Sequence, residues 1–351
     1  MEGDSTRGGS KSLSYTAPAV KEVAKRAGVS IATVSRVLSG KSLVSPELAG
    51  RVKLAAIELH YRPNRAARSL RARETRAIGV LVPDIENPFF TSIIAGIEEI
   101  LQAADYTLLL ANYSEDPERE SRLLRTLAGE SVDGIIFTPS GAQSREYQRL
   151  LDTGIPMVAV SRKPEGLRVD VVGVDNEGGA AEAVRHLLKL GHVRIAFVNG
   201  TLAVSTGREK EAGYYRAFRE AGVPVDPRLI LHTDWRHPSG SKAMNELLDL
   251  PSRPTAVFGG NNMITLGILE VIHGRGLQIP RDIAVVGFDD LVWATSLRPS
   301  LTAVAQPCGD VGRKAAELLL ARTADPTGET RNVEFAATLI VRYSCGQQWK
   351  W

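Results

Sequence analysis

Two series of short apolar runs, separated by segments with helical periodicity, dominate the chain after Arg76. The first series comprises AIGVLV, YTLLLA, DGIIFT, PMVAV and VVGV, and the second comprises RIAFVNG, RLILH, TAVFGG and IAVVGF. Alternation of this kind predicts parallel strands with covering helices. Two such series predict an α/β fold with two similar lobes, each built on its own parallel sheet.

The predicted core occupies residues 76–346, and its two lobes exchange chain near the end. The first lobe is expected at about 76–174 and 305–332, and the second at about 175–304 and 333–346. In this interpretation LTAVAQP does not extend the second series. Together with a helix around Gly312–Ala321 it forms the crossover back to the first lobe, and ATLIVRYS then completes the second lobe.

Parallel strands of two lobes direct their carboxyl ends toward a shared cleft, where a ligand is expected to bind. Residues that follow the apolar runs are therefore candidate ligand-binding residues, together with one lysine in STGREKEAGYYRAF. They are Asp84, Phe89, Arg162, Lys210, Asn262, Asp289 and Trp293. Any one of them could instead cap a helix or carry a surface charge, and only their shared position at strand ends favours the cleft.

The charge of the chain is divided unevenly between its front and its remainder. Residues 1–76 carry 15 Lys and Arg against 6 Asp and Glu, whereas the remaining residues carry 28 against 34. A polyanion-binding module needs such a local excess of positive charge, although a solvated basic tail would have the same composition.

The stretch EVAKRAGVSIATVSRVLSG separates these two alternatives. Its apolar residues predict two short helices, and Gly28 between them suits the left-handed corner of a tight turn. Ser30 can cap the second helix, while Ser45 and Pro46 mark the start of a third helix that can cover the first two. We therefore expect a disordered leader at residues 1–18 and a three-helix, helix-turn-helix headpiece at residues 19–62. An αα-corner without a ligand is the alternative.

The next segment, RPNRAARSLRARETR, predicts a short hinge helix and linker at residues 63–75. Asn64 can cap this helix, which at about two turns is marginal in water and needs a partner to form. A charged linker is the alternative, but such a linker has no reason to expose Leu70 among arginines.

These motifs resemble the lactose-repressor and galactose-repressor family of bacterial transcription regulators. The resemblance rests on EVAKRAGVSIATVSRVLSG, VSPELAGRVKLAAIELHYRPNRAARSL, IGVLVPDIENPFF, VVGVDNEGGA and VVGFDD, and extends over nearly everything from Val20 to Ser344. It implies a periplasmic-binding-protein-like core behind the headpiece. It also implies that the second helix enters the major groove of DNA and that a hinge leucine inserts into the minor groove.

The resemblance assigns roles to individual residues of the front region. The expected contacts to base edges come from Ile31, Ala32 and Arg36, and Arg36 can bind a guanine through two hydrogen bonds. The expected contacts to phosphates come from Lys21, Ser30, Thr33 and Ser35. The expected hinge contacts come from Asn64, Ala67, Leu70 and Arg71, with Leu70 as the wedge.

By the same resemblance, Phe89 stacks on the effector, while Lys210, Asn262 and Asp289 hydrogen-bond to its polar groups. Lys210 stands where the family usually has arginine, and Asn262 replaces an aspartate that commonly accepts hydrogen bonds from sugar hydroxyls. With Arg162 and Arg208 nearby, this pattern favours a pocket more cationic than a neutral-sugar site. The effector is expected to be a sugar or a sugar acid.

The function implied is that of a DNA-binding transcriptional repressor under control of a small metabolite. A homodimer on a palindromic operator is expected, because a single short recognition helix binds weakly. A periplasmic-type solute-binding receptor without a DNA role is the alternative, but it would need an export signal and has no use for the headpiece. We expect a cytoplasmic protein without a membrane span, since no run of about 18 apolar residues is present.

Enzyme function is disfavoured because the sequence lacks several catalytic signatures. No G-x-S-x-G, P-loop or H-E-x-x-H motif occurs, and no G-x-G-x-x-G opens a helix. The two cysteines lie far apart, and neither a cofactor nor a metal site is predicted.

Overall fold

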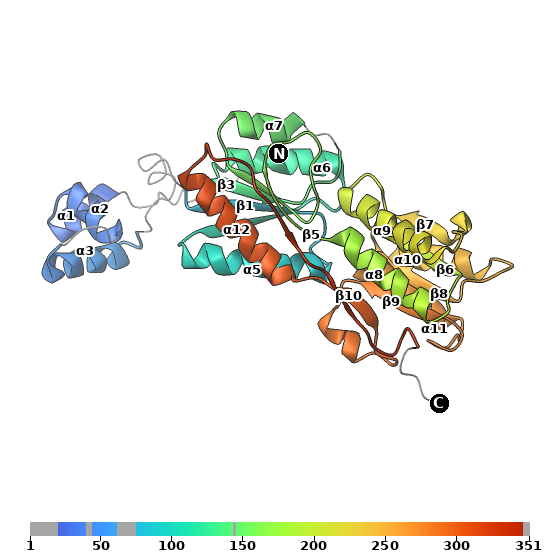
Figure 1. Ribbon diagram of the computed structural model, residues 1–351. Helices are drawn as coiled ribbons and strands as arrows, with labels where there is room; N and C mark the ends of the chain where they lie inside the picture. Colours follow the sequence, from blue (N-terminus) through green and yellow to red (C-terminus); the bar gives the residue numbers. More distant parts are fainter. Residues whose placement is uncertain (1–19, 40–43, 62–74, 143–144, 347–351) are drawn as a thin grey trace, which may run out of the picture. The chain divides into compact units, whose positions relative to one another are not determined.

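The computed structural model of the 351-residue chain describes residues 20–39, 44–61, 75–142 and 145–346. The chain divides into two compact units at Thr75, which are described separately (Figure 1). The predicted leader and the hinge residues Asn64, Ala67, Leu70 and Arg71 lie outside the described residues.

The first unit contains the three predicted helices of the headpiece. They are α1 (Val20–Ala27), α2 (Ile31–Ser39) and α3 (Pro46–Glu58). Their apolar faces share one small core, which contains Val23, Ala24, Ala27, Val34, Val52, Ala55 and Ala56. Small alanines at this centre let three short helices approach closely, and none of the three could be stable alone.

The turn between α1 and α2 has the chemistry that the sequence predicts. Gly28 adopts φ +65°, and the amide of Val29 donates to the carbonyl of Ala24 at 3.0 Å. Ser30 caps α2, because its hydroxyl accepts a hydrogen bond from the Thr33 amide at 3.1 Å. From α3, Nη2 of Arg51 donates to the last carbonyl of α1 at 2.6 Å, which fixes the two helices to each other.

The second unit contains two six-stranded sheets. Lobe 1 has strands β1 (Ala77–Val82), β2 (Thr107–Asn112), β3 (Gly134–Phe137), β4 (Met157–Val160), β5 (Asp170–Val174) and β11 (Asn332–Phe335), in the order β11-β5-β4-β3-β1-β2. Lobe 2 has strands β6 (Ile195–Gly200), β7 (Ile230–Thr233), β8 (Ala256–Gly259), β9 (Ala284–Phe288), β10 (Thr302–Ala305) and β12 (Thr338–Ile340), in the order β12-β10-β9-β8-β6-β7. All neighbouring strands are parallel except β10 and β12.

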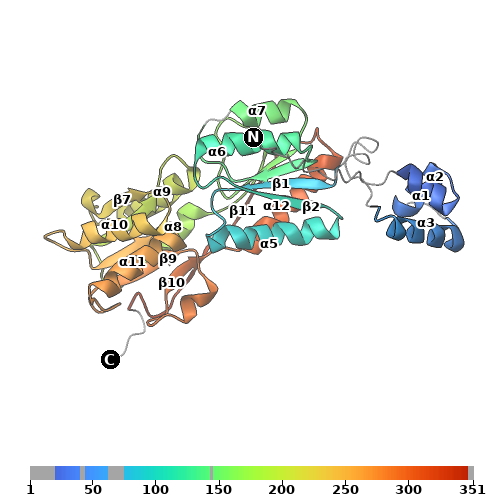
Figure 2. The ribbon, with the colours of Figure 1, turned by 180° about the vertical axis from the view of Figure 1, so that it is seen from behind.

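Helices cover both faces of each sheet (Figures 1 and 2). In lobe 1, α5 (Pro88–Ala103) and α12 (Cys308–Ala324) pack on one face, and α6 (Pro117–Gly129) and α7 (Arg145–Asp152) pack on the other. In lobe 2, α8 (Asn176–Lys189) and α9 (Ser205–Ala221) share one face, and α10 (His237–Leu248) and α11 (Asn262–Gly274) share the other. Two 3₁₀ turns, Pro227–Leu229 and Val292–Thr295, complete lobe 2. These layers confirm the predicted two-lobed α/β fold.

The alternation of side chains explains why the strands read as continuous apolar runs. In β1, Val80 and Val82 join the core under α5 and α12, whereas Leu81 joins the core under α6 and α7. Because helices cover both faces, both sets of side chains are buried.

The end of the chain differs from the sequence-based prediction in two respects. The run Thr302–Ala305 does extend the second series, because it forms β10 and pairs in parallel with β9. Asn332–Phe335 belongs to lobe 1 as β11, beside β5, so lobe 1 continues past the predicted boundary at residue 332. Buried Asp170 at the start of β5 anchors this return, since it pairs with Arg322 at 2.9 Å and Arg331 at 3.0 Å.

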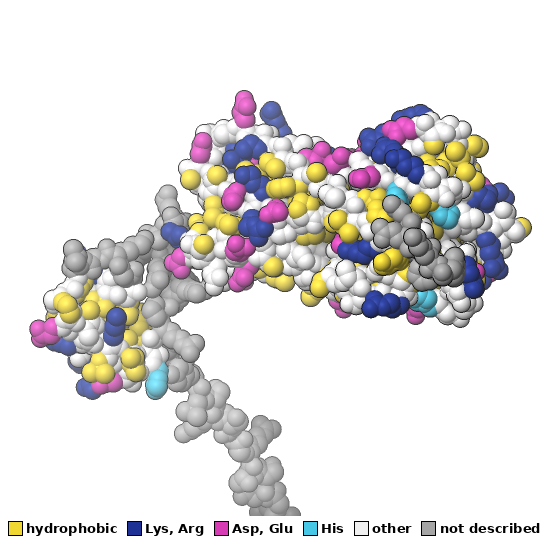
Figure 3. All heavy atoms as spheres, turned by 60° about the horizontal axis from the view of Figure 1, so that its bottom comes forward, with side chains coloured by type: hydrophobic (Ala, Val, Ile, Leu, Met, Phe, Trp, Pro, Cys, Tyr) yellow, Lys and Arg dark blue, Asp and Glu magenta, His cyan; other side chains and the backbone are white. Residues whose placement is uncertain are grey.

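Charged side chains of both signs are interspersed over the face of the second unit that Figure 3 shows. This face therefore lacks the single-sign field that is typical of a nucleic-acid-binding surface. None of the described helices is both long and apolar enough to cross a bilayer.

Gly28→Ala is expected to lower the free energy of unfolding of the headpiece by about 1–2 kcal/mol, the cost of left-handed backbone for an L-residue. Its Cβ would also lie 2.6 Å from Nη2 of Arg51. Thermal unfolding of the full chain, with amide hydrogen exchange over residues 20–61, measures the effect.

The matched control is Gly50→Ala inside α3, where an added Cβ meets no atom within 4 Å. This control is expected to be neutral or to stabilise by up to about 1 kcal/mol, because glycine weakens a helix interior. Equal effects of the two substitutions would contradict the role of Gly28.

Candidate functional site

The first candidate site is the exposed surface of α2 in the headpiece. Ala32, Ser35 and Arg36 are exposed there. Ile31 and Thr33 are half-buried, because Ile31 packs against the headpiece core and the Thr33 hydroxyl lies 2.9 Å from that of Ser30. Short side chains around one arginine leave the backbone of this helix accessible to a groove.

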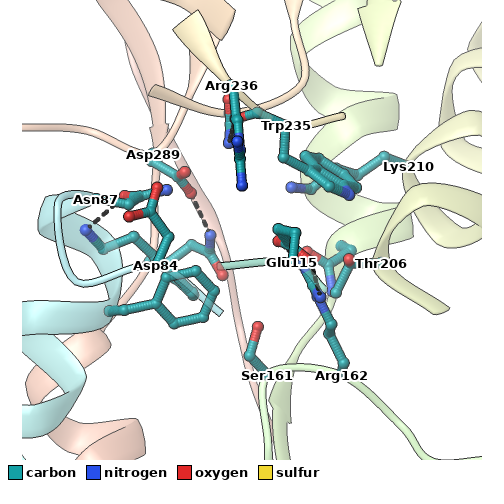
Figure 4. Close-up of a pocket in the computed structure, with 15 residues that line it drawn as sticks. Asp84, Asn87, Glu115, Ser161, Arg162, Thr206, Lys210, Trp235, Arg236 and Asp289 are labelled. Carbon is teal, nitrogen blue, oxygen red and sulfur yellow. Dashed lines mark hydrogen bonds and ion pairs between the residues drawn. The ribbon is translucent and has the colours of Figure 1, made fainter. Parts of the chain in front are cut away.

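The second candidate site is a cleft between the lobes, lined by residues that follow the parallel strands. Lobe 1 contributes Asp84, Asn87, Phe89, Phe90, Glu115, Ser161 and Arg162, and lobe 2 contributes Asn176, Thr206, Lys210, Trp235, Arg236, Asn261 and Asp289. Gln306 follows β10 at the crossover. Figure 4 shows these side chains converging from both lobes. The structure thus brings together five of the seven predicted cleft residues.

Four lining residues hold backbone conformations that L-residues rarely adopt. Glu115, Ser161, Trp235 and Asp289 have φ of 57°, 67°, 70° and 73°, and each follows a strand within a few residues. Backbone strain of this kind concentrates at binding sites, where the surrounding structure fixes the direction of each side chain.

Arg162 is buried in lobe 1 and pairs with Glu115. Its Nη2 donates to Oε1 of Glu115 at 2.5 Å and its Nη1 donates to Oε2 at 2.9 Å, so the pair is bidentate (Figure 4). Nη1 also donates to the carbonyl of Pro139 at 3.2 Å. Burial alone would lower the pKa of Arg162, but the Glu115 carboxylate raises it above its ordinary value. The guanidinium therefore stays charged and its charge is already balanced.

Lys210 is buried in lobe 2 with one hydrogen bond and two aromatic neighbours. Its Nζ donates to the carbonyl of Gly260 at 2.8 Å and lies 4.0 Å from the ring centre of Phe288 and 5.2 Å from that of Trp235. Burial lowers the pKa of Lys210 to about 8; the Asp289 carboxylate opposes this shift and Arg162 adds to it. Aromatic faces stabilise the ammonium without neutralising it.

Asp289 and Asn262 form a polar cluster at the ends of β9 and β8. Asp289 accepts hydrogen bonds from Nε2 of Gln306 at 2.5 Å and from the backbone N–H of Asn262 at 3.3 Å. Burial raises the pKa of Asp289, and Lys210 and Gln306 oppose that shift.

The lobes touch directly across the cleft. Nδ2 of Asn262 donates to Oδ1 of Asn87 at 2.8 Å, and Nη2 of Arg236 donates to the carbonyl of Ser114 at 2.5 Å. The remaining cavity measures only about 40 Å³, room for about three waters. The structure is therefore a closed form of the cleft, and a ligand larger than these waters needs the lobes to hinge open.

Two buried polar atoms near the cleft have no hydrogen-bond partner among the described residues. They are Oδ1 of Asn262, an acceptor, and Nε1 of Trp235, a donor. A hydroxyl group both donates and accepts hydrogen bonds, so a hydroxyl-bearing ligand has the chemistry to pair with this acceptor and this donor.

Two predicted cleft residues do not line the cavity. Trp293 lies in the turn Val292–Thr295 and is not among the residues that line the cavity. Trp235, after β7, is the cleft tryptophan instead. Asn262 is buried and joins the lobes through its hydrogen bond to Asn87.

The prediction of a cationic pocket is wrong. Arg208 does not line the cleft, and Arg162 is neutralised by Glu115. The lining carries the carboxylates of Asp84, Glu115 and Asp289 against the cations of Arg162, Lys210 and Arg236, so the formal charges balance.

Several cleft residues escaped the sequence reasoning although the same signal could have found them. Glu115, Trp235, Arg236 and Gln306 all follow strands, the position that also marks the predicted cleft residues. Gln306 follows the run Thr302–Ala305, which the sequence pattern places in the crossover rather than in the second series.

Within the described part of the chain, no group of three or more His, Cys, Asp or Glu could hold a metal ion. The cleft also lacks a nucleophile paired with a base, since its hydroxyls belong to Ser161 and Thr206 and no histidine lines it. The arrangement is suited to binding rather than to bond cleavage.

Lys210 should make stability depend on pH in the alkaline range. Between pH 8 and 10.5 the folded chain has released the Lys210 proton while the unfolded chain retains it, so the free energy of unfolding rises with pH. The free energy of unfolding of the wild type is expected to rise with pH more steeply than that of Lys210→Met, by up to about 1.4 kcal/mol per pH unit. Urea unfolding of both proteins from pH 7 to 10 measures this, and Lys242→Met, with an exposed lysine on α10, is the control. Parallel curves for wild type and Lys210→Met would contradict it.

Comparison with known proteins matches both units of the chain. Residues 75–342 match the model of periplasmic binding proteins and the sugar binding domain of the LacI family, and residues 19–64 match that of bacterial regulatory proteins of the lacI family. Catabolite control protein A of Priestia megaterium is 37% identical over 301 residues, which cover 86% of this chain and 91% of that protein.

Two solved structures extend these similarities to the fold. A complex of the transcriptional regulator CelR with cellobiose is 34% identical, covers 93% of this chain and 99% of its own, and superposes with a TM-score of 0.72. The Lac repressor dimer bound to operator and the anti-inducer ONPF is 25% identical, covers 94% and 99%, and gives a TM-score of 0.81. Since these relatives are transcription regulators, the prediction that the chain is not an enzyme is confirmed. The chain belongs to the LacI family of bacterial regulatory proteins.

Proposed function

We propose that the protein is a transcriptional repressor that binds a palindromic operator as a homodimer and responds to a neutral sugar held between its lobes. The proposal is carried by the presence in one chain of a helical headpiece suited to DNA and a core suited to a small ligand. The headpiece presents Ala32, Ser35 and Arg36 on an exposed helix, and the core holds a charge-balanced, polar cleft.

The headpiece supports DNA binding through geometry and charge together. The bond from Arg51 to Ala27 fixes α1 and α3 to each other, and the shared core packs Val34 of α2 against both, so the side chains of α2 keep fixed directions. Arg36 can read a guanine in the major groove, while Ala32 can contact a thymine methyl. Lys21, Ser30, Thr33 and Ser35 are proposed to hold phosphates, and they set register rather than sequence.

The hinge residues retain their proposed role in the minor groove. Asn64, Ala67, Leu70 and Arg71 follow the headpiece directly, and a helix of this length needs a partner such as a second copy or DNA to form. Two copies that read two half-sites roughly double the binding free energy of a single headpiece.

The cleft favours a neutral, hydroxyl-rich effector. The balanced charges leave no excess cation for an acid group, Phe89 offers an apolar ring face, and Asp84, Asn87 and Asp289 offer hydrogen-bond acceptors. CelR, which is similar over most of the chain, has been solved with cellobiose.

Regulation is proposed to follow from a change in the angle between lobes. The contacts of Asn262 with Asn87 and of Arg236 with Ser114 hold the closed form, and an effector replaces them with its own hydroxyls. The angle of the lobes then sets the separation of the two linkers in a dimer, which permits or prevents pairing of the hinge helices on DNA.

Arg36→Met is expected to weaken binding to the preferred duplex by about tenfold to a hundredfold, the value of one bidentate guanine contact. Selection from a random duplex library by the full-length protein supplies the preferred duplex, and titration at fixed salt measures the affinity. Lys53→Met, which removes an exposed cation from α3, is the matched control. Equal losses in both variants, on preferred and random duplexes alike, would reduce Arg36 to a phosphate contact.

The neutral member of each sugar and sugar-acid pair is expected to bind more tightly. Calorimetric titration of glucose with glucuronate and of galactose with galacturonate compares ligands that differ in one carboxylate. Phe89→Ala should weaken any ligand so detected by about tenfold, because the lost ring face removes its stacking contact. Tighter binding of the acids would restore the cationic interpretation of the cleft.

A further inference from the structure

A second cavity lies between the lobes and has different walls from the cleft. Its volume is about 310 Å³, compared with about 40 Å³ for the cleft. Lobe 1 contributes Arg145, Lys163, Glu165 and Leu167, and lobe 2 contributes Ala203 and Arg208. A molecule in this cavity would therefore contact both lobes at once.

The lining of this second cavity carries an excess of positive charge. Arg145, Lys163 and Arg208 come from three separate segments, and Glu165 is the one carboxylate among the described lining residues. The cleft, by contrast, has equal numbers of cations and carboxylates in its lining. The second cavity therefore favours an anion where the cleft favours a neutral ligand.

Arg208 is held in place independently of any ligand. Its Nη1 donates to the carbonyls of Leu202 at 2.7 Å and Ala203 at 3.1 Å, and its Nη2 lies 2.6 Å from Oε1 of Glu165 across the lobe boundary. The Glu165 side chain is 62% exposed, so an incoming anion can replace it at low cost.

The other two cations differ in how far they are committed. Nζ of Lys163 already pairs with Glu209 at 3.0 Å and Glu334 at 3.3 Å. Arg145 is exposed at the start of α7 and makes no ion pair with any residue that the structure describes. Its guanidinium can reach a ligand without breaking an existing bond.

The cavity and the cleft share two segments of backbone. Arg162 lines the cleft, and the next residue, Lys163, lines the second cavity. On α9, Thr206 lines the cleft and Arg208 lines the second cavity. At the rim, an added Cβ on Gly141 would lie 2.4 Å from the carbonyl oxygen of Ala203, so the backbones of the two lobes are in contact there.

We propose that the second cavity binds a small phosphate-bearing metabolite, and that the bound anion holds the lobes together by bridging Arg145 and Lys163 of lobe 1 to Arg208 of lobe 2. The site acts beside the cleft and does not depend on which effector the cleft takes. A phosphate group has enough acceptor oxygens for all three cations.

Calorimetric titration of the full-length protein with inorganic phosphate, at constant ionic strength set by chloride, tests the proposal. Saturable binding is expected, and Arg145→Gln and Arg208→Gln should each weaken it about tenfold, since each removes one charge-assisted contact. Arg122→Gln, which removes an exposed cation from α6, should leave phosphate binding unchanged. Unchanged thermal unfolding of Arg145→Gln excludes a folding defect.

A crystal soaked with tungstate locates the anion directly. Density between Arg145 and Arg208 supports the proposal, whereas density beside Arg162 and Lys210 places the anion in the cleft and overturns it. Absence of saturable phosphate binding, or equal weakening in Arg122→Gln, also overturns it. None of these outcomes bears on duplex binding by the headpiece, so the proposed repressor function is tested separately.

Discussion

The structure depends on one constraint, which is that every parallel strand of a sheet ends at the same edge. In each lobe the chain leaves its strands at that edge through short loops, and helices cover both faces. Polar residues after the strands therefore have one place to gather, and the two edges face each other across the cleft. The chain passes between the sheets after β5, after β10 and between β11 and β12, so the lobes can hinge but cannot separate.

The sequence predicts most of this architecture because burial on both faces leaves a direct trace in it. The apolar runs mark the strands, and Gly28, Ser30 and Ser45 mark the helix ends of the headpiece. The sheet to which a late strand belongs leaves no such trace. Two residues separate β11 from β12, yet β11 pairs with β5 in lobe 1 and β12 pairs with β10 in lobe 2.

The sequence predicts where the candidate site lies, but it does not predict how charge is distributed in it. The bond between Arg162 and Glu115 joins residues 47 apart, and neither residue by itself indicates the other. Arg208 and Lys210 are two positions apart on α9, and two residues rotate a helix by about 200°, so they face opposite sides. Helical phase alone places Lys210 in the cleft and Arg208 in the second cavity. Counting nearby cations therefore overestimated the positive charge of the cleft.

Few hydrogen bonds close the cleft, and the ion pairs of Arg208 with Glu165 and of Lys163 with Glu209 also join the lobes. These ion pairs are partly exposed and contribute at most about 1 kcal/mol each, so the closed form is easy to shift. Each neutral hydrogen bond across the lobes, such as that of Asn262 with Asn87, contributes about 1 kcal/mol. A ligand of micromolar affinity supplies about 8 kcal/mol, of which only the difference between the two forms moves the equilibrium. The buried ammonium of Lys210 and the unpaired acceptor of Asn262 both destabilise the empty closed form. Because the closed cavity has room only for waters, an effector binds the opened form selectively, and such selective binding is the condition for a ligand to change the angle of the lobes.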